Sequence, residues 1–327
     1  MGTKSPSPSC VQGACSMAEA KPSLTARIGI VTVTYNSESV LPEFLDSLSA
    51  QTWRDFTLYA VDNRSKDHTV AIVRGRTNLP IVVIANEENL GVAEGNNQGI
   101  RAALADGCDC ILLLNNDTVF PPDLLERLYG GLEQCGCEMT TAKMYYYDQP
   151  TRIWCAGGSF QPWLAYRARH AGLDEEDRAQ FDRPRRVTYS PTCCLLIRAE
   201  VFDRVGMMDS RYFVYFDDVD FLYRCLKQGV SLWYIPEAKL RHKVASLTGS
   251  DISKFSLHYA ARNKAYFIVK NIPRLHAFLP SLLFETYFRV STLRPDPAGQ
   301  RYRIKLAAWK EGKRMMQGQA LRGPAAG

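Results

Sequence analysis

The chain has 327 residues, of which 46% are apolar and 23% charged, and its formal net charge is +6 at pH 7. A chain of this length and composition can bury a substantial core, which excludes wholesale disorder and collagen-like or coiled-coil architectures. No apolar run approaches the ~20 residues that a membrane-spanning helix needs, because the longest candidate, 277–284, is short and contains Pro280 and Ser281.

The beginning of the chain and its cysteines indicate a cytoplasmic protein. Residues 1–26 contain no apolar stretch of the kind found in a secretory signal, so we expect a disordered leader, with translation starting at Met1 or Met17. The ten cysteines lack the CxxC pairs and nearby histidines of a zinc site. A disulfide scaffold is unusual at this length, and we interpret the cysteines as reduced thiols.

The strands and helices of the first half alternate along the sequence. Short apolar, β-branched runs predict buried strands at 28–36, 56–63, 79–86 and 110–117. The intervening segments predict helices, the first capped by Ser37, the next two over 67–76 and 92–105. A further helix is expected to begin at Pro121-Pro122. Alternation of this kind predicts an open, doubly wound, mostly parallel sheet with right-handed crossovers.

The second half of the chain is less regular. Between 140 and 190, Gly157-Gly158, Trp154 and Trp163 suggest loops over a cleft. Regular structure is expected again from a strand and short helix at 192–202, an acidic helix start within 212–229 and a strand at 230–236. Two helices are predicted over 251–270 and 273–290.

The net positive charge is concentrated in the tail. Residues 289–327 contain nine Lys and Arg but two Asp and Glu. Drawn as a helix, 301–316 places Tyr302, Leu306, Trp309 and Met316 on one face. This tail suits either an anionic membrane surface or a helix docked on its own protein or on a dimer partner. A nucleic-acid partner would rest on the tail alone, and we expect none.

Polar residues follow three of the predicted strands, where ligands of such sheets bind. These strand ends read Tyr35-Asn36, Asp62-Asn63 and Asn115-Asn116-Asp117. Asp62 could form a turn with Ser65 or accept a hydrogen bond from a nucleobase. The first strand is followed by neither GxGxxG nor GxxxxGK[ST], which disfavours dehydrogenases and P-loop ATPases.

Two groups of ionisable residues have a structural and a catalytic interpretation. Asp117 could cap a helix, or it could hold Mg²⁺ or Mn²⁺ together with a substrate diphosphate. His242 could be structural or a further metal ligand. Asp217, Asp218 and Asp220 would interact well with a helix dipole, but their mutual repulsion could also produce a general base.

Several motifs together resemble family 2 glycosyltransferases of the GT-A fold, over roughly residues 28–270. The similarity is carried by TYN at 34–36, VDNRSKD at 61–67, NLGVAEGNNQGI at 89–100, LLLNNDT at 112–118, CLLIRAEVFDRVGMMD at 194–209, YFDDVDFLYR at 215–224 and LRH at 240–242. The chain is most similar to the bacterial rhamnosyltransferase-like branch, whose metal motif is rich in Asn. The resemblance implies a Rossmann-like GT-A domain at 27–250, with a nucleotide-binding half to about 120 and an acceptor half beyond it. C-terminal helices and the basic tail at 251–327 would follow.

The resemblance also assigns roles to individual residues. Asp218 would be the catalytic base, while Asp117 and His242 would bind the metal. The donor would be bound by Thr34, Tyr35, Asp62, Asn89, Asn96, Asn115 and Asn116. Trp154, Tyr215 and Asp217 are candidate acceptor contacts. The chain departs from the family pattern at Asn115, which replaces the first Asp of the DxD motif, at Asp217, where many members have Glu, and at Glu94 and Met207-Met208, which replace small residues.

The activity implied is an inverting, metal-dependent transfer of a sugar from a nucleoside diphosphate to an acceptor hydroxyl. The donor would be TDP-rhamnose or a UDP-sugar, and the acceptor a glycan or a lipid-linked sugar of the cell surface. Two alternatives remain at this stage. A sugar nucleotidyltransferase usually carries a Gly- and Arg-rich loop after the first strand, where this chain has Tyr35-Asn36-Ser37. A non-catalytic carbohydrate-binding protein would use its acidic residues only as helix caps. The sequence assigns no oligomeric state.

Overall fold

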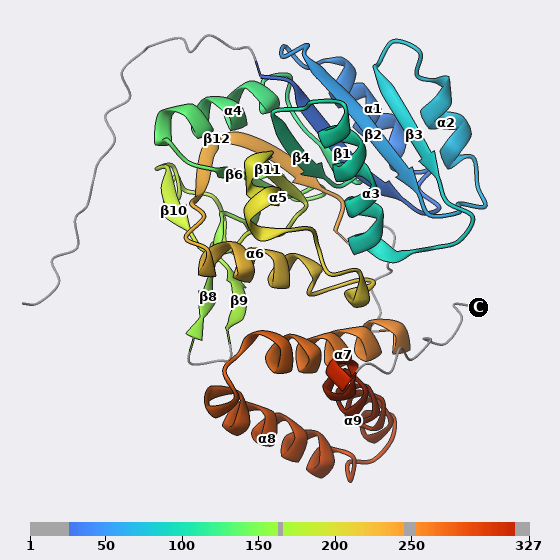
Figure 1. Cartoon of the computed structure of the whole chain (residues 1–327), viewed down its shortest axis with the longest axis vertical. Helices are drawn as coiled ribbons and strands as arrows, with labels where there is room; N and C mark the ends of the chain where they lie inside the picture. Colours follow the sequence, from blue (N-terminus) through green and yellow to red (C-terminus); the bar gives the residue numbers. More distant parts are fainter. Residues whose placement is uncertain (1–25, 163–165, 245–252, 318–327) are drawn as a thin grey trace, which may run out of the picture.

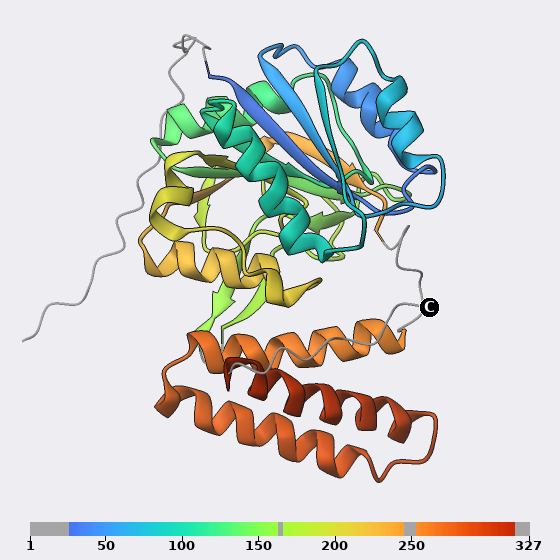
Figure 2. The same ribbon diagram turned by 45° about the vertical axis from the view of Figure 1, so that its right-hand side comes forward.

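A computed structural model describes residues 26–162, 166–244 and 253–317. It contains an α/β body and a unit of three helices at one end of that body (Figures 1 and 2). The expected leader with Met17, Trp163 and the last ten residues of the tail lie outside the described residues. Within the described residues, no helix combines the length and apolar character needed to cross a bilayer.

The first half forms the predicted alternation of strands and helices. Strands β1 (Ile28–Thr34), β2 (Phe56–Asp62), β3 (Ile81–Ala85) and β4 (Cys110–Leu114) pair in parallel in the order β3–β2–β1–β4. Helices α1 (Leu41–Ser49), α2 (Thr69–Gly75) and α3 (Gly91–Ala105) connect them. The predicted Ser37 cap is wrong. The Ser37 hydroxyl accepts a hydrogen bond from the Tyr35 backbone N–H, and α1 begins only at Leu41.

The second half extends this sheet with mixed strand directions. β11 (Cys194–Arg198) lies antiparallel between β4 and β6 (Met139–Tyr146). β12 (Leu232–His242) runs parallel to β6, with the short β10 (Arg185–Val187) at its outer edge. Two more short strands attach here, β5 (Thr118–Val119) to β12 and β7 (Ile153–Cys155) to β6. The sheet is therefore mixed: β1 to β4, β6 and β12 run in one direction, and β5, β7, β10 and β11 run in the other.

Helices cover both faces of the sheet and produce two apolar cores. One core contains side chains of α1, α2 and α4 (Leu124–Cys135). The other contains α3, α5 (Glu200–Val205) and α6 (Asp217–Lys227). Strand side chains alternate between the two cores, as β4 shows with Leu112 in the first and Leu113 in the second. Cysteines of the strands are buried, and no disulfide forms between the eight described cysteines.

The region from 140 to 190 was predicted as loops, and the structure corrects this. It contains most of β6, then β7, a hairpin of β8 (Gly158–Gln161) and β9 (Arg167–His170), and β10. The sequence of β6 is not recognisable as a buried strand because Lys143 interrupts its apolar pattern. The side chain of Lys143 is fully buried, and its ammonium pairs with Asp177 at 2.9 Å and with Asp182 at 2.5 Å. Burial of this charge is tolerable because two carboxylates, both from the segment between β9 and β10, pair with it.

The C-terminal unit consists of α7 (Lys254–Asn271), α8 (Arg274–Ser291) and α9 (Ala298–Arg314), with α9 between the other two (Figure 2). A short 3-10 turn, η3 (Met315–Gln317), follows α9. Trp309 of α9 is fully buried and its ring lies 5.4 Å from that of Phe284. The face of 301–316 that was considered for a membrane is therefore largely the inner face of this unit, which fits the alternative of a helix docked on its own protein.

Candidate active site

A cavity of about 420 Å³ opens at the carboxyl ends of β1 and β4. This is the edge at which a doubly wound sheet binds its ligands. Of the residues singled out from the sequence, the cavity is lined by Asn96, Asn115, Asn116, Asp117, Trp154, Tyr215, Asp217 and Asp218. Residues from separate strands, helices and loops thus meet in one place.

The donor residues at the ends of β1 and β2 are connected to one another. The Thr34 hydroxyl donates to Asp62 over 2.8 Å, and Asp62 also accepts the backbone N–H and the hydroxyl of Ser65. Asp62 and Thr34 are both buried. Asp62 therefore forms the turn with Ser65 that its sequence context allows. Tyr35, the next residue after β1, is 41% exposed.

Two asparagines organise the start of α3. The Asn89 side chain accepts the backbone N–H of Gly91, the first residue of the helix. Gly91 has a φ of +83°, and a Cβ there would lie 2.4 Å from the carbonyl oxygen of Phe213, so only glycine fits. Asn96 is buried on the cavity wall, where its amide nitrogen lies 3.8 Å from the sulfur of Met208.

The polar segment after β4 brings a carboxylate to an imidazole. Asp117 Oδ1 and His242 Nε2, at the end of β12, are 3.1 Å apart. Asn116 fixes this segment by donating to the Val33 carbonyl over 2.6 Å, while Asn115 is exposed to the cavity. The Nδ1 atom of His242 is buried and has no hydrogen-bond partner among the described residues.

The first turn of α6 presents two carboxylates to the cavity. Asp218 accepts a hydrogen bond from the Tyr189 hydroxyl over 2.6 Å and another from the Val219 backbone N–H. No cation forms an ion pair with Asp217 or Asp218 within the described part of the chain. Burial, reinforced by the charge of Asp218, raises the pKa of Asp217 to about 7. Burial also raises the pKa of Asp218, although the Tyr189 hydroxyl opposes this shift.

A row of rings connects the two ends of the cavity. Trp154 contacts the imidazole of His242 at 4.5 Å between ring centroids and that of His170 at 5.0 Å. His170 stacks on Tyr189 at 5.8 Å, and Tyr189 reaches Asp218. Burial lowers the pKa of His170, which keeps its ring neutral near pH 7. Sequence reasoning missed His170 and Tyr189, because both lie in the irregular region and no motif surrounds them.

A strained segment precedes the two carboxylates. Phe213, Tyr215 and Phe216 all have a φ between +62° and +68°, which is unusual for residues other than glycine. The buried amide of Asn263, on α7, donates to the carbonyl oxygens of Tyr212, Val214 and Tyr215 over 2.7–2.9 Å. Strained backbone persists where its surroundings over-determine it. The C-terminal unit therefore fixes the approach to Asp217.

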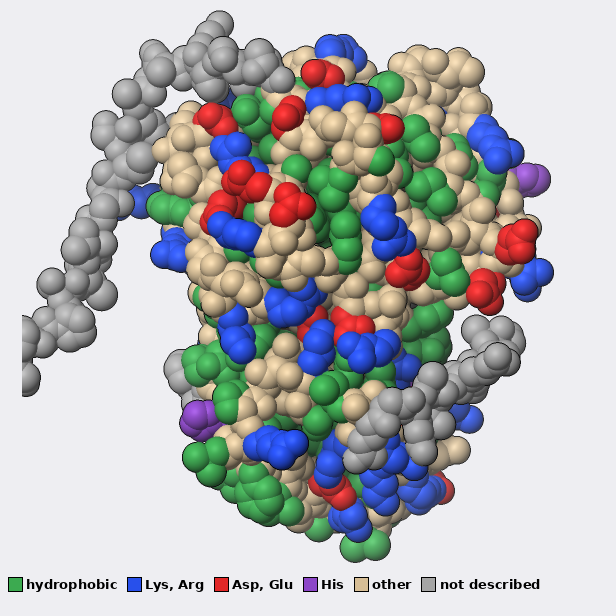
Figure 3. Space-filling view, viewed as in Figure 1, with side chains coloured by type: hydrophobic (Ala, Val, Ile, Leu, Met, Phe, Trp, Pro, Cys, Tyr) green, Lys and Arg blue, Asp and Glu red, His purple; other side chains and the backbone are tan. Residues whose placement is uncertain are grey.

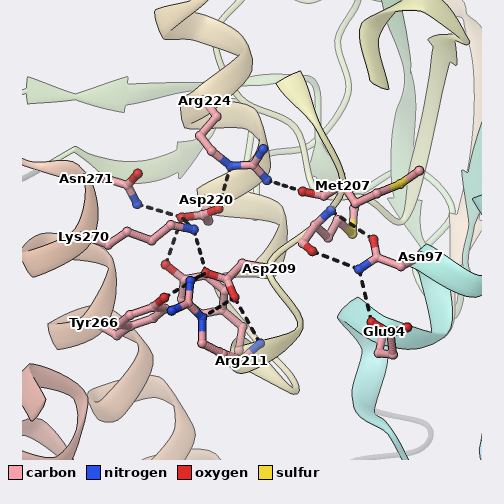
Figure 4. A network of polar contacts seen from close by, with 12 residues as sticks. Glu94, Asn97, Met207, Asp209, Arg211, Asp220, Arg224, Tyr266, Lys270 and Asn271 are labelled. Atoms are coloured by element: carbon pink, nitrogen blue, oxygen red, sulfur yellow. Dashed lines mark hydrogen bonds and ion pairs between the residues drawn. The ribbon is translucent and has the colours of Figure 1, made fainter. Parts of the chain in front are cut away.

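Asp220, the third acid of the motif, points away from the cavity. Figure 4 shows it among Arg224, Lys270 and Asn271, with contacts of 2.9, 2.7 and 2.7 Å. Lys270 of α7 also pairs with Asp209 at 2.7 Å. Asp209 precedes the short 3-10 turn η2 (Ser210–Tyr212). Asp220 is thus part of the connection between α6 and the C-terminal unit.

Comparisons with known proteins agree with this architecture. The family model for glycosyl transferase family 2 matches residues 29–206. The N-acetylglucosaminyl-diphospho-decaprenol L-rhamnosyltransferase of Mycobacterium tuberculosis is 28% identical over 75% of this chain and 84% of its own length. The dTDP-rhamnosyl transferase RfbF of Shigella flexneri is 26% identical over 76% of this chain and 82% of its own length.

A solved structure shows the same fold. The mannosyltransferase PcManGT from Pyrobaculum calidifontis, in complex with GDP-Man and Mn²⁺, superposes with a TM-score of 0.53 at 16% identity, covering 93% of this chain and 78% of that chain. The expectation of a GT-A fold with C-terminal helices is confirmed. The family model spans more than half of the chain and includes the polar segment after β4. The chain therefore belongs to glycosyl transferase family 2.

Proposed function

We propose that this protein transfers a sugar from a nucleoside diphosphate, TDP-rhamnose or a UDP-sugar, to an acceptor hydroxyl with inversion. The acceptor would be a glycan or lipid-linked sugar of the cell surface. The name of the mycobacterial relative contains a lipid-linked sugar acceptor, and that of the Shigella relative contains a dTDP-rhamnosyl donor. The observation that carries the proposal is the placement of Asp117 and Asp218 on the walls of one cavity. The family assignment favours this function over a sugar nucleotidyltransferase.

Asp218 has the position and environment of a general base. It is only partly exposed, it faces the cavity, and no cation pairs with it in the described residues. A carboxylate in such surroundings accepts a proton more readily than one in water. Asp218 would remove the proton of the acceptor hydroxyl as its oxygen attacks the anomeric carbon and the bond from that carbon to the diphosphate breaks. The Tyr189 hydroxyl orients the carboxylate.

Asp117 and His242 suit a divalent cation held jointly with the donor. Carboxylate oxygen and imidazole nitrogen are both ligands for Mn²⁺, and the buried Nδ1 of His242 lacks a hydrogen-bond partner in the described chain. In the described residues, no group of three or more His, Cys, Asp or Glu side chains is arranged so that it could hold a metal ion by itself. Further ligands would have to come from the donor diphosphate. Mg²⁺ or Mn²⁺, when bound, stabilises charge on the leaving diphosphate.

The remaining predicted residues divide between donor and acceptor. Thr34, Tyr35 and Asp62 would border the nucleobase, while Asn89 and Asn96 would lie near the nucleotide. Because Asp62 already accepts three hydrogen bonds, its contribution there would be to hold the strand ends in place. Trp154, Tyr215 and Asp217 line the cavity near Asp218 and would contact the acceptor sugar.

A donor screen tests the proposed function. UDP-, TDP- and GDP-sugars would be compared by thermal shift with Mn²⁺ and with EDTA, because a ligand that binds only the folded state raises its melting temperature. We expect stabilisation by one class of donor in Mn²⁺ and its slow hydrolysis. Stabilisation without any hydrolysis or transfer would favour the non-catalytic carbohydrate-binding alternative.

We also propose that the protein works at the cytoplasmic face of an anionic membrane, through α8 rather than α9. Leu275, Phe278, Leu279, Leu282, Leu283 and Val290 of α8 are each half or more exposed. Residues 253–317 carry thirteen Lys and Arg against three Asp and Glu. Figure 3 shows hydrophobic and basic side chains together on this end of the molecule. Apolar contact combined with positive charge is typical of interfacial helices.

Co-sedimentation with vesicles tests this placement. The wild-type protein should pellet with phosphatidylglycerol vesicles at low salt and be released at high salt. Replacing Leu275, Leu279 and Leu283 together by Ser should abolish sedimentation, whereas Val82→Ser, an exposed apolar position on β3, should not. A dimer that dissociates in the triple variant, without vesicle binding by the wild type, would instead assign the α8 face to a second copy of the chain.

A further inference from the structure

A second cavity, of about 400 Å³, shares Tyr215 with the active site. Its apolar wall includes Leu257 and Ala260 of α7 and Phe288 of α8. Tyr215 lines both this cavity and the one that contains Asp218. The hydrogen bonds from Asn263 hold the backbone of Tyr215 in place. We call this second cavity the Tyr215 groove.

Two lysines without acidic partners enter the groove. Lys264 of α7 is half-buried, and its Nζ lies 3.7 Å from the centroid of the Phe284 ring. Lys305 of α9 is also half-buried. Within the described residues neither forms an ion pair, whereas Lys270 and Lys313 of the same unit both do. Two ammonium groups beside an apolar wall are unfavourable unless an anion neutralises them.

The lowered pKa of Lys264 shows that its charged form is destabilised in this environment. Burial, with a contribution from the positive charge of Arg167, lowers the pKa of Lys264 to about 8. An anion bound against Lys264 and Lys305 would reverse this shift. Besides the two lysines and the hydroxyls of Tyr215 and Ser256, the lining consists of the apolar side chains of Leu257, Ala260, Ala261 and Phe288, so the ligand should be anionic at one end and apolar at the other.

We propose that the Tyr215 groove binds the phosphate or diphosphate of a lipid-linked acceptor, with the first carbons of the lipid against Leu257, Ala260 and Phe288. The sugar beyond the phosphate would then pass Tyr215 and present its hydroxyl to Asp218. The lipid chain would leave toward α8, whose apolar side chains are exposed. This inference rests on the proposed glycosyl transfer and specifies how its acceptor is held.

Calorimetric titration with three probes tests the groove: farnesyl diphosphate, inorganic pyrophosphate and farnesol, all in EDTA. We expect farnesyl diphosphate to bind at least tenfold more tightly than either of the others. Lys264→Gln and Lys305→Gln should each weaken it about fivefold, the effect of roughly 1 kcal/mol per basic residue. Ala260→Phe should fill the exposed wall and weaken binding without changing any charge.

Lys310→Gln is the matched control, since Lys310 is an exposed lysine of α9 outside the groove. Equal affinity in the Lys264→Gln, Lys305→Gln and Lys310→Gln variants would overturn the proposal. Pyrophosphate binding as tightly as farnesyl diphosphate would also overturn it, since the site would then take any anion. Asp117→Ala should leave farnesyl diphosphate affinity unchanged, which separates the groove from the donor site.

Donor binding distinguishes this inference from the function on which it rests. Each groove variant should keep the thermal shift that the donor produces with Mn²⁺. A donor shift in the wild type without farnesyl diphosphate binding would refute the groove alone. Absence of any donor shift would refute the proposed transfer, and the titration in EDTA would still report whether the groove binds an amphipathic anion.

Discussion

The carboxylates at the two ends of the acidic motif on α6, Asp217 with Asp218 and Asp220, lie in opposite electrostatic environments. Asp220 is buried and the nearby Asp209 half-buried, and both form ion pairs within the group Arg224, Lys270 and Arg211. Burial opposes ionisation of Asp209, but its bonds to Arg211, Lys270 and Tyr266 outweigh this and lower its pKa. Asp217 and Asp218, only one turn away, form no ion pair with any cation among the described residues, and burial raises the pKa of both.

The presence or absence of a paired cation distinguishes carboxylates with a structural role from carboxylates with a catalytic role, although all three lie within four residues. A carboxylate that is paired with cationic side chains is neutralised by them and is not available to accept a proton from a substrate. An unpaired carboxylate at a cavity costs stability, and such cost is common where a group must exchange protons. The comparison therefore assigns Asp220 to the scaffold and Asp218 to catalysis, and each assignment can be tested separately.

Asp220→Asn should have the largest effect on stability. The substitution leaves the half-buried Arg224 and Lys270 beside a neutral amide, and removing the buried member of such an ion pair costs about 3 kcal/mol. Urea unfolding should show this loss, while Asp217→Asn should be neutral or stabilising because it relieves the repulsion with Asp218. If the two variants unfold at the same urea concentration, the distinction between the acids is wrong.

Asp218→Asn should abolish transfer while the protein stays folded. The amide keeps the shape of the side chain but cannot accept a proton, so the rate should fall on the order of a hundredfold or more, about 2.7 kcal/mol in activation free energy. Donor affinity, measured by thermal shift with Mn²⁺, should be retained. Near-normal turnover would instead indicate Asp217 as the general base, since Asp220 is already held in ion pairs with Arg224 and Lys270.

Local sequence patterns correctly predicted the strands of the first half and the polar residues that follow β4. Apolar runs placed β1 to β4, and their polar ends placed Asn115, Asn116 and Asp117 on the cavity. The acidic motif was recognised, but its division was not, because Lys270 and Asn271 reach Asp220 from some fifty residues away. No local pattern could indicate that pairing.

The same limitation explains the features that sequence reasoning missed. β6 was predicted as a loop because Lys143 interrupts its apolar pattern, and the compensating Asp177 and Asp182 follow it by more than thirty residues. His170 and Tyr189 lie in strands and loops without periodicity, and they become neighbours of Asp218 only through tertiary packing. The basic tail was correctly noted, but the buried side of α9 depends on contacts with α8.

Asp117→Ala should affect the donor rather than the scaffold. If Asp117 and His242 share a cation with the donor diphosphate, the variant should lose about tenfold in donor affinity when Mn²⁺ is present. In EDTA the affinities of the variant and the wild type should agree, and EDTA should abolish transfer until Mn²⁺ or Mg²⁺ is restored. Full activity after exhaustive chelation would indicate that cationic side chains stabilise the leaving group.

The smallest expected effect is the dependence of stability on pH, and it separates the two acidic regions directly. Asp217 has a pKa raised to about 7 in the folded protein, so it stabilises the fold while protonated, and this contribution is lost as the pH rises through about 7. Asp209 has a lowered pKa, so its contribution is lost only in acid, below its ordinary pKa. Between pH 6.5 and 8.5, of the two acidic regions only that of Asp217 should therefore respond.

Thermal unfolding of the wild type and Asp217→Asn across this interval, in EDTA, measures the response. The variant keeps every other titrating group, including His170, so the difference between the two curves isolates Asp217 and its coupling to Asp218. We expect the wild type to lose about 1 kcal/mol relative to the variant, which corresponds to roughly 2–4 °C in melting temperature. Parallel curves would mean that Asp217 is ionised throughout, and the environment of the two cavity carboxylates would then have to resemble that of Asp209 and Asp220.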